Sequence, residues 1–155
     1  MIRRGASSDV PFMRDMLTHA YYWRWGTPEA EDIPTSRYVD AWGRPGDTAV
    51  IALDGGFPVG AAWYRTFTED APGFGYVDAK TPELTVAVVP SKRGKGLGEQ
   101  LLTALLERAR DAGHETISLS VERANPARKL YERFGFREVD ERGDTVVMVA
   151  ELDGG

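Results

Sequence analysis

The sequence contains no cysteine, and its two histidines, His19 and His114, stand far apart. Without cysteine the chain can form neither a disulfide bond nor a thiolate metal site. Two imidazoles are also too few for the usual ligand set of a structural zinc ion, so no metal is expected. Long apolar runs are missing as well, and the charged N-terminus, MIRRGASSDV, has no apolar stretch behind it. We therefore expect no membrane span, no signal peptide and a cytoplasmic location.

Basic residues are also fewer than acidic ones. Lysine and arginine number 19 against 24 aspartates and glutamates, which gives a formal net charge of −5. This balance argues against binding to nucleic acid or to an anionic membrane, because such binding draws its affinity from a positive surface. Apolar residues make up 42% of the 155 residues, and no repeat, low-complexity tract or linker divides the chain. The composition is therefore that of one globular domain, residues 1–155.

Hydrophobic periodicity and turn signals divide the chain into helices and strands. Helices are predicted from the Ser8-Asp9 cap to about Ala20, after Pro34, over residues 99–112 and over residues 126–134. Strands are predicted near the N-terminus and over residues 48–53, 58–67, 83–89, 116–121, 137–140 and 145–152. Because strands and helices alternate only in the second half, the pattern predicts an α+β or mixed α/β layer arrangement.

Residues 91–102, SKRGKGLGEQLL, join the strongest predicted strand to a leucine-rich helix. The first amides of a helix have no internal partner, and the helix dipole adds partial positive charge beside them. Glycine lets the oxygens of a ligand approach the backbone, and Lys92, Arg93 and Lys95 add full charges. A surface turn with solvated basic side chains is the alternative. The position between strand and helix favours a pyrophosphate cradle.

The spacing of the three glycines excludes the common nucleotide folds. A Walker motif needs Gly-Lys followed by Ser or Thr, which this sequence lacks. A Rossmann fingerprint needs Gly-x-Gly-x-x-Gly early in a βαβ unit, whereas Gly94, Gly96 and Gly98 follow the fourth or fifth predicted strand.

Two motifs resemble the GNAT family of acetyl-coenzyme A-dependent N-acetyltransferases. Arg93, Gly96 and Gly98 match its signature of Arg or Gln, two residues, Gly, one residue, then Gly or Ala. Residues 125–136, NPARKLYERFGF, are similar to its Asn…Ala-x-x-Leu-Tyr-x-x-x-Gly-Phe segment, and residues 2–17 are similar to its first strand and helix. The order of predicted elements agrees with the family over nearly the whole chain.

The resemblance implies a GNAT-like fold in one domain, with a mixed, mostly antiparallel central sheet of about six to seven strands and about four helices. It implies acetyl-coenzyme A (acetyl-CoA) as the donor, with the backbone of Val86 and Val88 bonding its pantetheine arm. The amides from Gly94 to Gly98 would then hold the pyrophosphate, and Arg93 and Lys95 would supply charge.

Asn125 departs from the family pattern, because it stands two residues before Ala127 where three is the commoner spacing. Two interpretations stay open. Asn125 either reaches the cofactor or caps the short helix ahead of Pro126.

Two further residues are candidates for proton transfer during direct acetyl transfer in a ternary complex. By its motif position Tyr131 is the candidate general acid for the departing thiolate; the alternative is a core residue beside Leu130 and Phe134. Glu83, at the start of the cofactor strand, is the candidate general base for the amine. Its alternative is an ordinary solvated strand end. The missing cysteine rules out an acyl-cysteine intermediate.

The resemblance leaves the acceptor open beyond a small-molecule or peptide amine. A non-catalytic CoA-binding or regulatory module on the same fold is the alternative function. Dimers are common among similar proteins, so a homodimer is compatible with the resemblance.

Overall fold

The computed structural model describes residues 1–21, 35–92 and 94–152. In chain order the elements are β1 (Ile2–Arg4), η1 (Ser7–Asp9), α1 (Val10–Tyr21), η3 (Thr35–Tyr38), β2 (Thr48–Asp54), β3 (Phe57–Arg65), β4 (Glu83–Val88), η4 (Pro90–Lys92), α3 (Leu97–Asp111), β5 (Thr116–Glu122), α4 (Ala127–Arg133), β6 (Arg137–Arg142) and β7 (Thr145–Glu151). The η elements are 3₁₀ helices. Among the described residues, no helix has both the length and the apolar character that crossing a bilayer requires.

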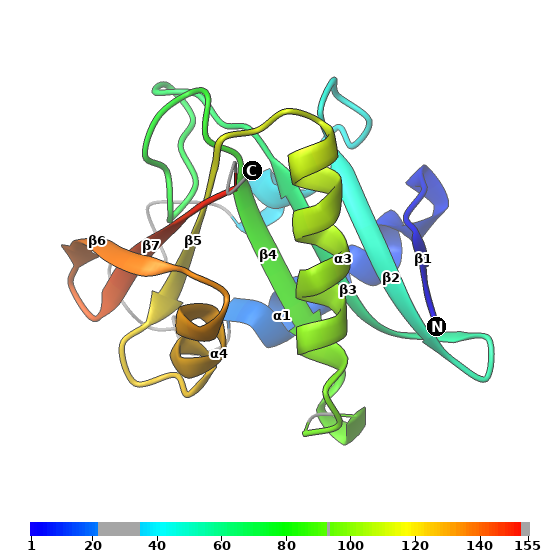
Figure 1. The fold of residues 1–155 in the computed structure, drawn as a ribbon. Coiled ribbons are helices and arrows are strands. Elements are labelled where there is room, and N and C mark those ends of the chain that lie inside the picture. The colour runs from blue at the N-terminus through cyan, green and yellow to red at the C-terminus, as the bar shows by residue number, and fades with distance from the viewer. Residues whose placement is uncertain (22–34, 93, 153–155) are drawn as a thin grey trace.

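The strands form one sheet in the order β1-β2-β3-β4-β5-β7-β6. Every neighbouring pair is antiparallel except β4 and β5, which are parallel. The predicted mixed, mostly antiparallel sheet is therefore confirmed, with seven strands. Figure 1 shows α3 lying across one face of the sheet and α1 across the other.

Strand alternation gives the sheet a separate apolar core on each face. The α3-side core includes Val50, Leu84, Leu101, Leu105, Leu119, Tyr131 and Met148. The α1-side core includes Met13, Met16, Tyr38, Ile51, Trp63, Phe67 and Phe74. Within β4, Val86 and Val88 pack on the α3-side core and Ala87 on the α1-side core. Neighbouring side chains of β4 therefore lie on opposite faces of the sheet.

The helix predicted after Pro34 is wrong in extent, because the structure forms only the short 3₁₀ helix η3 there. Ala41 has a φ of 53°, which a right-handed helix cannot accommodate. The carbonyls of Arg37 and Asp40, which a continuing helix would use for its own bonds, accept hydrogen bonds from Arg65. Three α-helices consequently lie among the described residues, against about four predicted.

Candidate active site

Strands β4 and β5 pair at a single position within the described residues, Glu83 opposite Ser118. There the Ser118 amide donates to the Pro82 carbonyl at 2.9 Å. On its other edge β4 pairs with β3 along its whole length, from Glu83 to Val88. The two parallel strands therefore diverge directly after Glu83, and Figure 1 shows their C-terminal ends well apart.

Backbone alternation decides which peptide groups of β4 face the divergence. The Val89 amide donates to the Val59 carbonyl at 2.9 Å, so the odd-numbered residues of β4 bond toward β3. The peptides of the even-numbered residues are directed toward β5. Val86 and Val88, predicted to meet the pantetheine arm, both lie in this even-numbered set, and their side chains are half-buried.

The glycine turn ahead of α3 has the conformation that only glycine adopts without strain. Gly94 and Gly96 each have a φ of +79°, and a Cβ at either position would meet no atom within 4 Å. Gly96 is the N-cap of α3, and its carbonyl accepts the bond from the Gln100 amide at 3.1 Å. The amides of residues 97–99 precede that bond and are left at the helix end. Such a turn fits a diphosphate group.

Side chains around the glycine turn divide into two groups. Lys95 is exposed, whereas Lys92 contacts Asp54 in the β2–β3 hairpin, with 2.6 Å between Nζ and Oδ2. The hydrogen bond from Lys92 holds the pKa of the Asp54 carboxyl below its usual value. Asp54 was missed from the sequence, where its only signal was a hairpin turn. Arg93 lies outside the described residues.

Helix α4 lies beside the start of α3. A Cβ on Gly98 would lie 3.7 Å from the Leu130 side chain, which places the two helices in contact range. Tyr131, on α4, is 8% exposed, belongs to the α3-side core and packs edge-on against Phe136, with ring centroids 6.0 Å apart. Burial against Phe136 gives the Tyr131 ring a packing role, and a role for its hydroxyl stays a prediction.

Asn125 caps α4. Its Oδ1 accepts a hydrogen bond from the Ala127 amide at 2.9 Å, which satisfies one of the unpaired donors of the first turn. The side-chain oxygen is therefore engaged in this cap, while the side-chain amide nitrogen is the group that could donate to a cofactor.

Glu83 is buried, with 1% of its surface exposed, so the interpretation as a solvated strand end is wrong. The Tyr38 hydroxyl donates a hydrogen bond to Glu83 Oε2. The same hydroxyl accepts a bond from the Phe74 amide at 2.7 Å. A Cβ on Gly73 would lie 2.3 Å from Glu83 Oε1, so only glycine fits at that point. Sequence reasoning missed Tyr38 and Gly73, although the Gly-Phe-Gly run at 73–75 is typical of close backbone contact.

Glu83 and Tyr131 lie on opposite sides of the sheet. Glu83 contacts Tyr38 of the α1-side core, and Tyr131 belongs to the α3-side core. Among the described residues, the divergence between β4 and β5 opens the sheet directly after Glu83 and so connects the two sides there. The described residues hold no cluster of three or more His, Asp or Glu side chains placed to share a metal ion.

The profile of the acetyltransferase (GNAT) family matches residues 10–136. The chain belongs to this family. A mycothiol acetyltransferase of Corynebacterium aurimucosum is 41% identical over 83 residues, which are 53% of this chain and 25% of that protein. A ribosomal protein bS18-alanine N-acetyltransferase of Haemophilus influenzae is 42% identical over 57 residues, 37% of this chain and 39% of that protein.

An L-methionine sulfoximine/L-methionine sulfone acetyltransferase of Pseudomonas paraeruginosa is 34% identical over 113 residues. That match spans 72% of this GNAT chain and 63% of the relative. The GNAT chain thus spans less than two thirds of the length of each of these three relatives.

Solved structures share the fold over the full chain. YncA of Salmonella typhimurium, determined with its cofactor acetyl-CoA, is 22% identical with a TM-score of 0.75, covering 100% of this chain and 95% of that one. A phosphinothricin acetyltransferase of Sinorhizobium meliloti in complex with acetyl-CoA is 24% identical with a TM-score of 0.72, covering 100% and 89%. The predicted GNAT fold is confirmed.

Proposed function

We propose that this GNAT protein transfers an acetyl group from acetyl-CoA to a primary amine by direct transfer in a ternary complex. The observation that carries the proposal is the divergence of β4 from β5 directly after Glu83, next to the left-handed glycine turn that begins α3. One feature directs the peptides of alternate β4 residues into the gap where an extended arm would lie, and the other offers helix amides to a diphosphate.

Acetyl-CoA binding is assigned to residues of β4 and of the glycine turn before α3. The peptides of Val86 and Val88 bond the pantetheine arm. The amides from Gly94 to Gly98 hold the pyrophosphate, with charge from Lys95 and, as predicted from the motif, from Arg93. The side-chain amide of Asn125 donates from the start of α4. These assignments are supported by the backbone directions of β4 and by the positive φ of Gly94 and Gly96.

When bound, acetyl-CoA supplies the acetyl group as a thioester. The C–N bond forms as the C–S bond breaks, one proton leaves the amine nitrogen, and one proton arrives on the sulfur. Glu83 accepts the proton from the amine, because a positioned carboxylate can act as a general base. Tyr131 donates its phenolic proton to the sulfur as the general acid. Proton exchange with solvent then restores both side chains.

The acceptor belongs to the class of small-molecule or peptide amines. The relatives support this class, because one is named for a ribosomal-protein alanine and another for L-methionine sulfoximine and sulfone. An L-amino acid N-acyltransferase of Escherichia coli, 26% identical over 139 residues, adds free amino acids to the panel worth testing.

The test combines calorimetry with a thiol-release assay. Acetyl-CoA should bind, and at least one amine among L-methionine sulfone, other L-amino acids and an alanine-initiated peptide should trigger release of free CoA. The chain has no cysteine, so a thiol reagent would report CoA without a protein background. Tyr131→Phe should keep binding and lose turnover. Binding without turnover on any amine would replace the proposal by a CoA-binding regulatory module, and no binding would reject both.

A further inference from the structure

The Tyr38 hydroxyl sits between a backbone donor and the Glu83 carboxylate. The Phe74 amide donates to it at 2.7 Å, and it donates in turn to Glu83 Oε2. A hydroxyl has one proton, so accepting from Phe74 directs that proton toward Glu83. An ionised carboxylate only accepts hydrogen bonds, so the arrangement matches the ionised form of Glu83.

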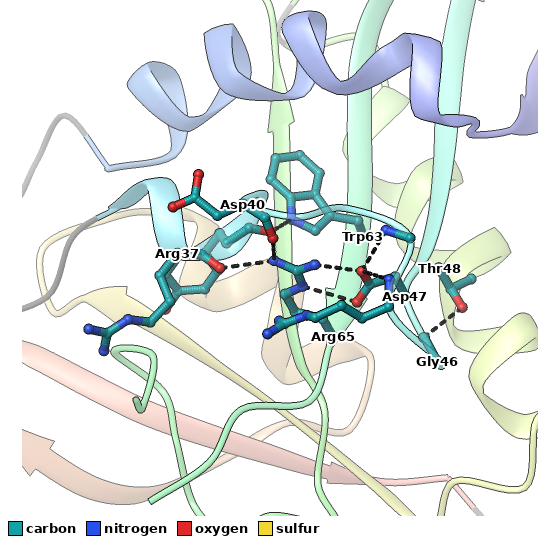
Figure 2. Close-up of polar contacts among 10 residues, drawn as sticks. Arg37, Asp40, Gly46, Asp47, Thr48, Trp63 and Arg65 are labelled. Carbon is teal, nitrogen blue, oxygen red and sulfur yellow. Dashed lines mark hydrogen bonds and ion pairs between the residues drawn. The ribbon is translucent and has the colours of Figure 1, made fainter. Parts of the chain in front are cut away.

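Three bonds from β3 fix the backbone that carries Tyr38. Trp63 Nε1 donates to the Tyr38 carbonyl at 3.0 Å. Arg65 Nη1 donates to the carbonyls of Arg37, one residue before Tyr38, and Asp40, two residues after it, at 3.0 and 2.8 Å. Figure 2 shows the Arg65 guanidinium inside this ring of acceptors. These bonds hold the backbone around Tyr38, and the hydroxyl itself is held by its bonds with Phe74 and Glu83.

The loop that carries the Phe74 amide is also held by side-chain hydrogen bonds. Arg142 donates to the carbonyls of Phe74 and Tyr76 at 3.0 and 2.9 Å. Arg37 Nη1 donates to the Pro72 carbonyl at 2.6 Å. The Phe74 amide is thus presented to Tyr38 by a loop with three side-chain contacts to its carbonyls.

Among the described residues, the strands on either side of β4 carry two charged side chains to consider beside Glu83, Arg65 on β3 and Glu122 on β5. Arg65 is the Cα partner of Glu83 across β3 and β4, but its described bonds go to Asp47, Arg37 and Asp40. Helix α1 contributes the apolar side chains of Met13, Met16 and Leu17 to this face. Strand β5 contributes the Ser118 hydroxyl opposite Glu83, and Glu122 lies further along the same strand.

We infer that Tyr38 is a positioning residue, whose hydroxyl holds the Glu83 carboxylate ionised and in one orientation for the amine. The inference rests on the proposed function, in which Glu83 is the base. It requires that loss of this hydroxyl act through Glu83 and through no other group.

The experiment compares Tyr38→Phe with Tyr64→Phe. Tyr64 is a matched control because it is also buried, but it belongs to the α3-side core and packs against His114. Tyr38→Phe should lower kcat about tenfold, less than the 10²–10⁴ of a whole general base, and leave the KM for acetyl-CoA unchanged. The acidic limb of the kcat/KM profile should move to higher pH, because the ionised carboxylate loses a donor.

A double-mutant cycle tests whether the Tyr38 hydroxyl acts through Glu83. In a Glu83→Gln background, Tyr38→Phe should cause no further loss of rate, because both changes remove the same interaction. Additive losses, or a Tyr38→Phe pH profile identical to that of Tyr64→Phe, would overturn the inference.

A readout without turnover separates the inference from the proposed function. Glutamate labelled with ¹³C at the carboxyl carbon, with the Glu83 signal assigned from its loss in Glu83→Gln, gives a titration curve by NMR. The midpoint should rise in Tyr38→Phe and not in Tyr64→Phe. An unchanged midpoint rejects the inference whether or not the protein is active. An inactive wild type with a shifted midpoint rejects the proposed function and leaves the contact between Tyr38 and Glu83 established.

Discussion

At the scale of the residue, Gly96 and Asn125 each satisfy a structural need at the place where a ligand is proposed to bind. Gly96 supplies the left-handed N-cap of α3, and Asn125 supplies the side-chain oxygen that caps α4. Changes at such residues alter stability and binding together, so the Gly96 variant is compared with the same substitution at Gly98, where no left-handed backbone is strained.

Gly96→Ala and Gly98→Ala form such a pair. Alanine at residue 96 must adopt a φ of +79°, which should cost about 1–2 kcal/mol of folding free energy and weaken acetyl-CoA binding. Gly98 lies inside α3, where a Cβ makes an ordinary 3.7 Å contact, so Gly98→Ala should gain roughly 0.5–1 kcal/mol. Urea unfolding and calorimetry measure both effects. Equal stability of the two variants would contradict the assigned backbone strain.

His114 gives a pH-dependent prediction. Burial lowers the pKa of this imidazole below its ordinary 6.5, so the unfolded chain binds the proton more tightly than the folded one. Well above pH 6.5 neither state is protonated and His114 has no effect on stability. As pH falls below that value, the unfolded chain gains protons first and the free energy of unfolding declines.

The matching variant is His114→Phe, which keeps a ring against Tyr64, 5.4 Å away between centroids. Urea unfolding at pH 7 and pH 5 should show a smaller acid loss of stability in the variant than in the wild type. The same loss in both proteins would show that His114 does not contribute.

At the scale of the element, the segment between η3 and β2 is attached to the sheet by one buried ion pair. Arg65 Nη2 and Asp47 Oδ2 are 2.5 Å apart, with side chains 0% and 3% exposed. The Trp42 ring lies 5.2 Å from the Arg65 guanidinium carbon. The same guanidinium also donates hydrogen bonds to the carbonyls of Arg37 and Asp40, so the pair contributes to holding the backbone around Tyr38.

Asp47→Ala should therefore destabilise the protein by about 3–5 kcal/mol, because it leaves a buried guanidinium without its counter-ion. Arg14→Ala is the control: the Arg14–Asp40 pair is 3.7 Å apart with both side chains more than half exposed, and its loss should cost less than about 1 kcal/mol. Denaturation with urea compares the two. Similar losses would mean that the buried pair is no stronger than a surface pair.

At the scale of the whole molecule, the separation of β4 from β5 after Glu83 leaves a gap in the sheet between its two faces. On the proposed function the donor lies on the face of α3 and α4, and the amine reaches it past Glu83 from the face of α1. On the proposed function, the two substrates therefore approach from opposite faces and meet between the strands.

Acetyl-CoA should stabilise the whole fold by mass action. At a concentration of 100 times Kd the gain is about 2.7 kcal/mol. For a chain of this size that corresponds to a rise in Tm of roughly 5–10 °C. Pantetheine at equal concentration should give a smaller rise, because it lacks the diphosphate that the Gly94–Gly98 amides are proposed to hold. Equal shifts with both ligands would argue against the cradle.

Much of the fold follows from local pattern. The strands, α3 and α4 were predicted within a few residues, because apolar periodicity, glycine and proline mark their faces and ends. The helix after Pro34 failed for a non-local reason: Arg65, far along the chain, takes the carbonyls of residues 37 and 40. The glycine turn is observed where the sequence places it, with φ values that glycine alone adopts readily, and its role as a pyrophosphate cradle stays a prediction.

By itself the sequence determined the order of elements, the glycine turn before α3 and the membership of the GNAT family. Each depends on neighbouring residues whose spacing is visible along the chain. Only the tertiary structure decided that Glu83 is buried, that Tyr38 donates to it and that Arg65 turns to Asp47. These partners stand 45 and 18 positions apart, so packing across the sheet, which no local periodicity encodes, selects them.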